Sequence, residues 1–272
     1  LSNPDYYEDV LVATETAFEK KRAMAEGQIN TEALSTKKVK LAKTGIGGMG
    51  ANVFFYKHLR ESFRANRFGL WGMTSLFTVV GAALFSVFLR GGEGKIFILL
   101  QTLMWMQIFM IGTGRGLKEL YSHYIYLIPE NSFRKIVWSN LEIAFKVLVE
   151  SLVIFGIAGL ILGESIGSIV AAMLVYSLFS FLLLGINYLS LRWTGANISA
   201  GLLIIIYTIA VILIMLPGLI AAIVLAITIE NNGLLIGLGV LALWELLAGL
   251  GCFALSKGIL HRVDMPVLKT EK

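Results

Sequence analysis

The chain has 272 residues, of which 57% are hydrophobic and 15% are charged, and its formal net charge is +5. A soluble domain has about half apolar and about a quarter charged residues. Here the apolar residues lie in long runs, so the sequence predicts an all-α integral membrane protein and excludes an ordinary soluble domain. The single cysteine, Cys252, excludes a disulfide framework and a cysteine-based metal site, and we expect neither a cofactor nor a metal in this chain.

Residues 1–50 are predicted to form a cytoplasmic helix followed by a basic linker. Helix-start signals lie near Pro4, and Gly27 fits just beyond the end of the helix. The linker ends in a glycine cluster, residues 45–50, that matches the spacing G-x-G-x-x-G. No predicted strand precedes this cluster, and no acidic residue follows at the distance that a dinucleotide site needs. A flexible hinge is therefore the better interpretation.

Residues 51–67 are predicted to form an amphipathic helix that lies in the membrane interface. At helical spacing Phe55 and Phe63 share one side with Ser62, and basic residues occupy the other side. Such a helix, directly before an apolar span, places its aromatic rings among the acyl chains and its cations near anionic headgroups. The residues expected to contact membrane lipids are Phe55, Lys57, Arg60, Phe63, Arg64 and Arg67.

Six apolar segments within residues 68–256 are predicted to cross the membrane, because most are close to the roughly 20 residues that a bilayer core requires. Their expected bounds are 68–89, 95–114, 141–162, 169–191, 200–229 and 234–256. All lysines and arginines except Arg90 and Lys95 fall on one side of this arrangement. Both termini, including the tail 257–272, are therefore predicted to be cytoplasmic. This distribution explains the positive net charge without a nucleic-acid partner.

The fifth segment, 200–229, is longer than a bilayer requires and contains Pro217-Gly218 near its middle. A Pro-Gly pair breaks a helix, and a broken helix is tolerated at membrane depth where protein covers it. We expect a span over 200–216 and a short re-entrant or outer-surface helix over 218–229. One tilted, kinked helix is the alternative.

A charged and aromatic stretch, residues 115–140, separates the second and third predicted spans, and we call it the elbow. Apolar residues between Leu117 and Ile128 recur at helical spacing, and Pro129 ends that helix. Asn131 or Ser132 is suited to cap a second helix. We expect the elbow to face the cytoplasm and to contact a soluble partner through Tyr124, Tyr126, Leu127, Pro129, Glu130, Asn131, Arg134 and Lys135.

Acidic residues also occur within or beside the spans. Glu142, Lys146 and Glu150 recur every four residues, and they are expected either to solvate a protruding helix end or to support the elbow. Glu245 lies inside an apolar run, where acids normally face the bundle interior. It is expected either to hydrogen-bond Trp244, Asn187 or a backbone group, or to lie on a transport path. The candidate polar residues of the bundle are Glu150, Asn187 and Glu245.

This layout resembles the membrane-spanning half of a type-2 ABC exporter permease, and in particular a bacterial ABC exporter family. That fold has an interfacial helix, a coupling helix between spans two and three, and re-entrant helices between spans five and six. The corresponding stretches here are Gly50–Arg67, Tyr124–Lys135 and Leu216–Asn232. The local sequences DYYEDVLVATE and GANVFFYKHLRESFR are also similar to the middle of such a family member, whereas the elbow departs from the usual turn at Glu130-Asn131.

The resemblance implies a permease half that exports a substrate across a bacterial plasma membrane. A cytosolic ATP-binding subunit would carry the ATP and Mg²⁺ and dock on the elbow, and a second six-helix half would complete the path. The chain itself has no Walker motif or hydrolase signature, so we expect it not to be an enzyme. Six spans without a starting Met are expected of the C-terminal half of a longer permease.

Two other functions remain open on the sequence. An ion-coupled secondary transporter would use Glu150 or Glu245 to bind a proton. A non-transporting membrane protein, such as an immunity or assembly factor, would use the same bundle without moving a substrate.

Overall fold

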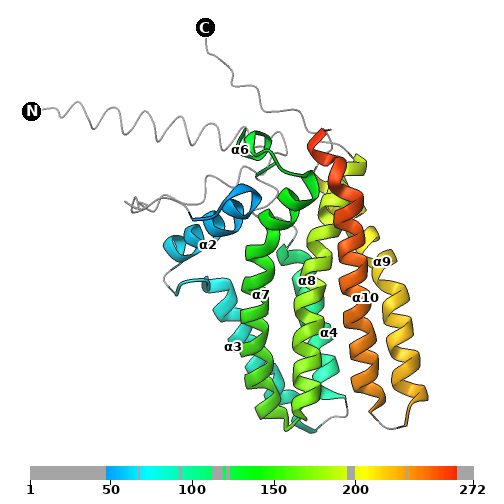
Figure 1. Ribbon diagram of the computed structural model, residues 1–272. Helices are drawn as coiled ribbons and strands as arrows, with labels where there is room; N and C mark the ends of the chain where they lie inside the picture. The colour runs from blue at the N-terminus through cyan, green and yellow to red at the C-terminus, as the bar shows by residue number, and fades with distance from the viewer. Residues whose placement is uncertain are drawn as a thin grey trace, which may run out of the picture.

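The fold is a bundle of long helices with a short helix across one end (Figure 1). The computed structural model describes residues 47–66, 68–91, 94–111, 119–120, 123–194, 200–230 and 232–261. The elements within these ranges are η2 (Gly50–Asn52), α2 (Val53–Ala65), α3 (Met73–Phe88), η3 (Leu89–Gly91), α4 (Lys95–Ile111), α6 (His123–Leu127), α7 (Ser132–Leu162), α8 (Ile166–Thr194), α9 (Ala200–Thr228), α10 (Gly233–Ser256) and η4 (Lys257–His261).

Five stretches are long and apolar enough to cross a membrane: Met73–Gly91, Ser132–Leu162, Ile166–Thr194, Gly201–Thr228 and Gly233–Leu260. They confirm an all-helical, multi-span protein. The predicted second span corresponds to α4, which is apolar but has only 17 residues. At 1.5 Å per residue it is about 26 Å long, slightly less than a bilayer core of about 30 Å. The six-span count therefore stays a prediction.

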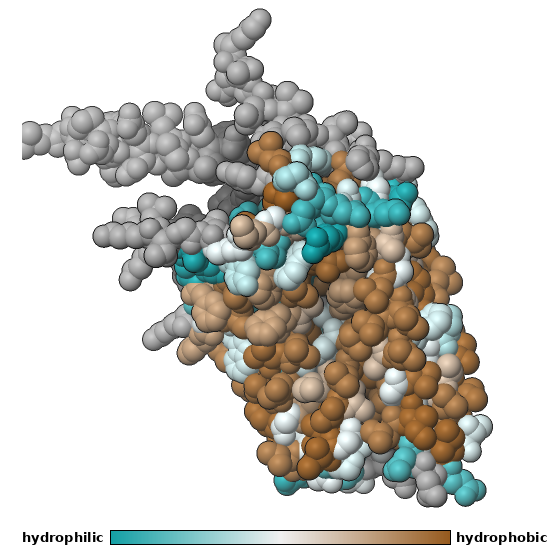
Figure 2. Space-filling view, in the orientation of Figure 1, coloured by the Kyte–Doolittle hydropathy of each residue, from teal (hydrophilic) through white to brown (hydrophobic). Residues whose placement is uncertain are grey.

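The face of the bundle seen in Figure 2 is mostly hydrophobic along its length, and hydrophilic residues gather near its two ends. Large side chains that a soluble protein would bury are exposed on the surface of the bundle, including Phe77, Phe109 and Leu213. Water would penalise such a surface, whereas lipid tails solvate it. We call the end that carries α2 and α6 the α2 end, and the opposite end the far end.

Helix α8 lies at the centre of the bundle, where it packs against α4, α7, α9 and, most extensively, α10. Small residues allow the close approach of α8 and α10. A Cβ atom on Gly185 would lie 3.0 Å from both the Gly249 carbonyl oxygen and the Cys252 Cβ. The seam between α8 and α10 is therefore a fixed part of the bundle.

Helix α7 joins the second elbow helix and the third span into one element. The Asn131 side chain accepts a hydrogen bond from the Phe133 N–H at 3.2 Å and so caps the helix, as predicted. The helix begins at Ser132, before the predicted span start at residue 141, and runs for 31 residues to Leu162. At 1.5 Å per residue that is about 46 Å, so its first turns extend beyond a bilayer core.

The two cations that depart from the charge asymmetry lie at the far end and close α7. Arg90 donates from Nε to the Ile161 carbonyl at 3.0 Å, and Lys95 Nζ approaches the Leu162 carbonyl at 3.5 Å. These are among the last carbonyls of α7, which have no partner within the helix. Arg90 and Lys95 thus act as caps.

The expected helix break at Pro217 is wrong, because α9 runs without interruption from Ala200 to Thr228. The structure agrees with the alternative of a single long helix. Proline disturbs the hydrogen bonds of the preceding turn, and the Trp244 indole N–H donates to the Ile214 carbonyl there at 2.9 Å. A Cβ on Gly218 would overlap the Trp244 ring, so the glycine leaves room for the indole. Neighbouring α10 thereby stabilises the turn that proline weakens.

Candidate functional site

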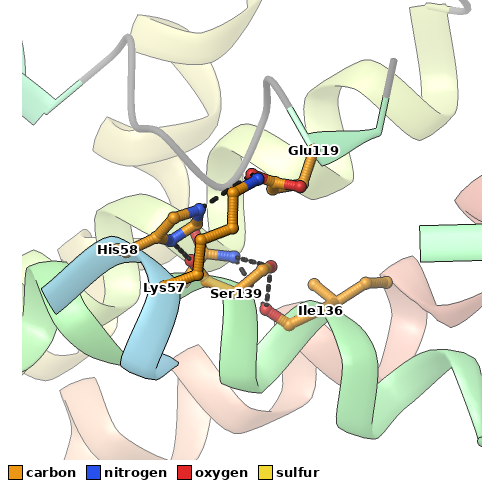
Figure 3. A network of polar contacts seen from close by, with 6 residues as sticks. Lys57, His58, Glu119, Ile136 and Ser139 are labelled. Carbon is orange, nitrogen blue, oxygen red and sulfur yellow. Dashed lines mark hydrogen bonds and ion pairs between the residues drawn. The ribbon is translucent and has the colours of Figure 1, made fainter. Parts of the chain in front are cut away.

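The candidate site is a buried polar network that joins α2, residues 119–120 of the elbow and α7 (Figure 3). The buried face of α2 consists of Phe54, His58 and Ser62, spaced four residues apart, and α2 packs on α7. The sequence had placed Ser62 on the lipid-facing side with Phe55 and Phe63, and that assignment is wrong because Ser62 is buried. The face of α2 that packs against the rest of the protein is therefore the face that carries His58 and Ser62.

Glu119 is the centre of the network. One of its carboxylate oxygens, Oε1, accepts from Lys57 Nζ at 2.6 Å and from His58 Nε2 at 2.9 Å. The other ring nitrogen of His58 donates to the Ser139 carbonyl on α7 at 3.0 Å. Glu119 and His58 are only 6% and 1% exposed, so water does not compete for these bonds.

Glu119 is held in its ionised form. Burial by itself would raise the pKa of its carboxyl group, but the hydrogen bonds and positive charges of His58 and Lys57 outweigh burial and lower the pKa below its ordinary value. A carboxylate whose pKa falls on folding stabilises the folded state above its unfolded-state pKa. It loses that contribution as the pH falls through the folded-state pKa.

Two further bonds connect the same elements. Ser62 donates from its hydroxyl to Glu142 on α7 at 2.6 Å. Glu130, which the sequence assigned to a soluble partner, instead accepts from the Ala51 N–H at 3.1 Å. Gly50 has a φ of +64°, and a Cβ there would overlap the Glu130 carboxylate, so a glycine is needed next to this bond. The elbow is thus bonded to the start and the middle of the η2–α2 segment, and α7 is bonded to its later part through Glu142.

A groove opens where the start of α2 meets the elbow, and we call it the elbow groove. Its volume is about 540 Å³ and its lining is mostly apolar. Leu127, on its rim, is 71% exposed although it lies outside the long apolar helices. The described residues that line it are Gly50, Val53, Phe54, Lys57, Leu127, Ile128 and Pro129.

The predicted partner contacts divide into exposed and enclosed residues. Leu127, Pro129, Asn131 and Arg134 are exposed. Lys135 is buried, which removes it from the set that a partner can reach. The remaining residues are Glu130, which is bonded to α2, Tyr126, whose hydroxyl donates to the Leu120 carbonyl at 3.0 Å, and Tyr124, whose side chain lies outside the described residues.

The predicted lipid contacts of α2 divide in the same way. Phe63 and Arg64 are exposed, and Arg60 is half-buried. Phe55 packs edge-on against Trp138 and Phe145 of α7, with ring centroids 6.3 and 6.2 Å apart, so it is not free for the acyl chains. The last two are Lys57, which pairs with Glu119, and Arg67, which lies outside the described residues.

The acidic residues of α7 are buried. Glu142 and Glu150 are 2% and 8% exposed, so the expectation that they solvate a protruding helix end is wrong. Glu142 instead holds α2 through Ser62, which supports the elbow end of the bundle. Glu150 lies deeper in the bundle, beside Ser75 of α3 and Lys146 one turn earlier in α7.

Glu245 faces the bundle interior, as predicted, and is completely buried. Neither of its carboxyl oxygens has a hydrogen-bond partner among the described residues. The expected bond to Trp244 does not form, because that indole bonds to Ile214. Asn187, another polar candidate, is also buried, at 2% exposure on α8.

Comparison with protein-family models matches residues 1–264 to the family described as "Putative ABC exporter". The chain belongs to this ABC exporter family. The comparisons with curated proteins and with solved structures found no match. Membership agrees with the apolar, multi-span bundle and with the absence of nucleotide-binding motifs from the sequence.

Sequence reasoning missed Glu119 and His58 as partners. They are 61 positions apart, and nothing in the local sequence pairs them. The one available signal was the four-residue spacing of Phe54, His58 and Ser62. Residues at this spacing share one face of a helix, so His58 and Ser62 lie on the same face as the apolar Phe54. In this chain that spacing marks a buried polar seam.

Proposed function

We propose that this chain is one membrane-spanning half of an ABC exporter, which moves its substrate across the plasma membrane with ATP hydrolysed by a separate cytosolic subunit. The single observation that carries the proposal is the exposed apolar surface of the elbow, a segment that is bonded to the bundle. The elbow offers an exposed apolar residue, Leu127, and an apolar groove at one end of the bundle, while it is bonded to both α2 and α7.

The elbow is built to transmit a force. Asn131 caps α7, so the end of the elbow is continuous with a helix of the membrane bundle. Glu119 bonds to α2 through His58 and Lys57, and His58 bonds to α7. A partner that displaces the elbow therefore moves α2 and α7 as well. In the exporter this displacement would open a path between the chain and a second six-helix half.

The orientation follows from charge. The α2 end faces the cytoplasm, because the lysines and arginines cluster on that side of the spans. The ATP-binding subunit approaches from there and supplies ATP and Mg²⁺, and the permease half carries no catalytic residue of its own. The elbow is then the coupling helix, and both termini are cytoplasmic.

An ion-coupled transporter is a second candidate function, and buried Glu245 favours it. Its carboxyl oxygens have no hydrogen-bond partner within the part of the chain that the structure describes, and such an intramembrane acid is a group that a proton can neutralise. The two functions differ in their energy source. Export that stops when ATP is withheld and continues after the ion gradient is dissipated supports the ABC exporter, and the reverse supports ion coupling.

Docking at the elbow is tested by changing Leu127 to Ala together with Arg134 to Glu. Both residues are exposed, so the bundle should fold, whereas the apolar and charged contacts with a partner are lost. We expect the affinity for the purified ATP-binding subunit to fall by about 30-fold or more, as at an interface hot spot. Binding to chain in lipid nanodiscs is the measurement.

The matched control is Leu160→Ala, which removes an exposed leucine at the far end of α7. Its affinity should equal that of the unchanged chain, and all proteins should melt at similar temperatures. An unchanged affinity of the elbow variant would remove the elbow from the interface.

A further inference from the structure

Both ring nitrogens of His58 face hydrogen-bond acceptors. Nδ1 lies 3.0 Å from the Ser139 carbonyl oxygen, and Nε2 lies 2.9 Å from Oε1 of Glu119. A carbonyl oxygen only accepts, and so does an ionised carboxylate. A neutral imidazole has one N–H, so either of its tautomers would leave a nitrogen lone pair against an oxygen lone pair. The geometry therefore requires a proton on each nitrogen.

Moving a proton onto Glu119 does not remove this requirement. Oε1 also accepts from the Lys57 ammonium at 2.6 Å, so the atom that faces His58 is already the acceptor of a charged donor. Together the two donors hold the carboxyl group ionised. The charges alternate as Lys57 positive, Glu119 negative and His58 positive.

The surroundings of His58 hold this arrangement in place. From α2 the charged neighbour is Lys57, and from the elbow it is Glu119. From α7 the Ser139 carbonyl and Asn140 approach, and Glu142 lies one turn further on, bonded to Ser62. From α8 the Tyr188 hydroxyl lies beside Ser139 and Asn140. Glu119 is the carboxylate that bonds directly to the His58 ring.

We propose that His58 is kept as a positively charged imidazolium and positions the elbow against α2 and α7. As a role in transport, this inference rests on the proposed function of the elbow. With the proton in place, His58 bonds the elbow to the bundle through two charge-assisted hydrogen bonds. When the proton leaves to water, the neutral ring keeps only one of those bonds, and its contact with either Glu119 or the Ser139 carbonyl turns repulsive.

The elbow is then ordered only within a window of pH. A neutral His58 ring has a single N–H, so it cannot bond to both the elbow and α7. Lowering the pH far enough protonates Glu119, which removes its attraction for both cations. Both changes release the same segment, so its order should be greatest between them.

A spin label at Leu127, introduced as Leu127→Cys in a Cys252→Ala background, reports elbow motion in the chain alone in nanodiscs. We expect its mobility to rise several-fold between about pH 6 and about pH 9. His58→Gln should be mobile throughout this range, and His58→Lys, which keeps a positive charge, should be ordered throughout. Glu61→Gln, an exposed change on the same helix, should behave as the parent chain.

Mobility that does not change with pH in the parent chain would overturn the proposal, as would a His58→Gln protein that keeps the parent response. If a variant does not fold, ¹⁵N NMR of the unchanged chain decides. The histidine resonance that belongs to His58 must show two similarly protonated nitrogens near neutral pH, and a neutral tautomer would contradict the proposal. These readouts need no ATP-binding subunit, so their failure is distinguishable from a failure of docking.

Discussion

Glu119→Gln is expected to loosen the α2 end of the bundle more than any other single change in the network. The substitution keeps the shape of the side chain but removes the charge that pairs with Lys57 and His58, leaving His58 buried among uncompensated groups. Breaking one partner of a buried ion pair costs about 3–5 kcal/mol. We expect the lower part of that range, since Lys57 is partly exposed. Hydrogen exchange of the α2 and elbow amides is the measurement.

Glu61→Gln is the control for this change, because Glu61 is exposed on the same helix. It should leave exchange at His58 and Ser139 unaltered. If Glu119→Gln protects these amides as well as the unchanged chain does, Glu119 does not hold the elbow. The effect should also be local, because α8, α9 and α10 are stabilised by their packing against one another.

Glu245→Met is expected to act in the opposite direction and to raise the melting temperature. The carboxyl group is fully buried and has no hydrogen-bond partner among the described residues. Methionine has a similar volume and needs no partner. A buried polar group without a hydrogen bond costs about 1–3 kcal/mol of stability, which the apolar side chain does not incur. Thermal unfolding in detergent is the measurement.

The Glu245→Met variant also shows whether Glu245 has a role in transport or only a place in the structure. A more stable protein that exports normally would make Glu245 a tolerated defect of the bundle. A more stable protein that has lost export would mark it as functional, because sites that carry function commonly reduce stability. A lower melting temperature would mean that Glu245 has a partner in the intact transporter.

Local signals in the sequence predicted the elements whose ends depend on neighbouring residues. Asn131 was expected to cap a helix after Pro129, and it does so through its own side chain two positions away. The apolar runs likewise predicted the long helices, because hydrocarbon solvation requires long apolar stretches. Only their ends shifted, most clearly at α7, which begins at Ser132.

Long-range contacts decided the features that the sequence did not predict. Pro217 was expected to break α9, but Trp244, 30 positions from Ile214, supplies a donor at the disturbed turn. The lipid-facing side of α2 was assigned from its aromatic residues, yet Ser62 is buried because Glu142, 80 positions away, accepts its hydroxyl. Partners at such separations leave no periodic pattern in the chain.

These contacts change the description of the elbow. It was expected to present charged residues such as Glu130 and Lys135 to a soluble partner. In the structure Glu130 is bonded to Ala51 and Lys135 is buried, so Leu127 and Pro129 beside the elbow groove make the exposed surface more apolar than expected. Docking should therefore depend on burial of apolar surface more than on charge, and weaken little with added salt.

The most direct test of coupling at the elbow is a photo-crosslink from Leu127 in native membranes. A photoreactive amino acid replaces Leu127, and a second protein carries it at Leu160 on the far end of α7 as the control. If the elbow docks an ATP-binding subunit, the Leu127 probe yields a crosslinked protein whose peptides include a Walker A motif, and the Leu160 probe does not. Equal crosslinking from both positions, or a purified complex with its ATP-binding subunit in which Leu127 never crosslinks, would contradict the proposed function of the elbow.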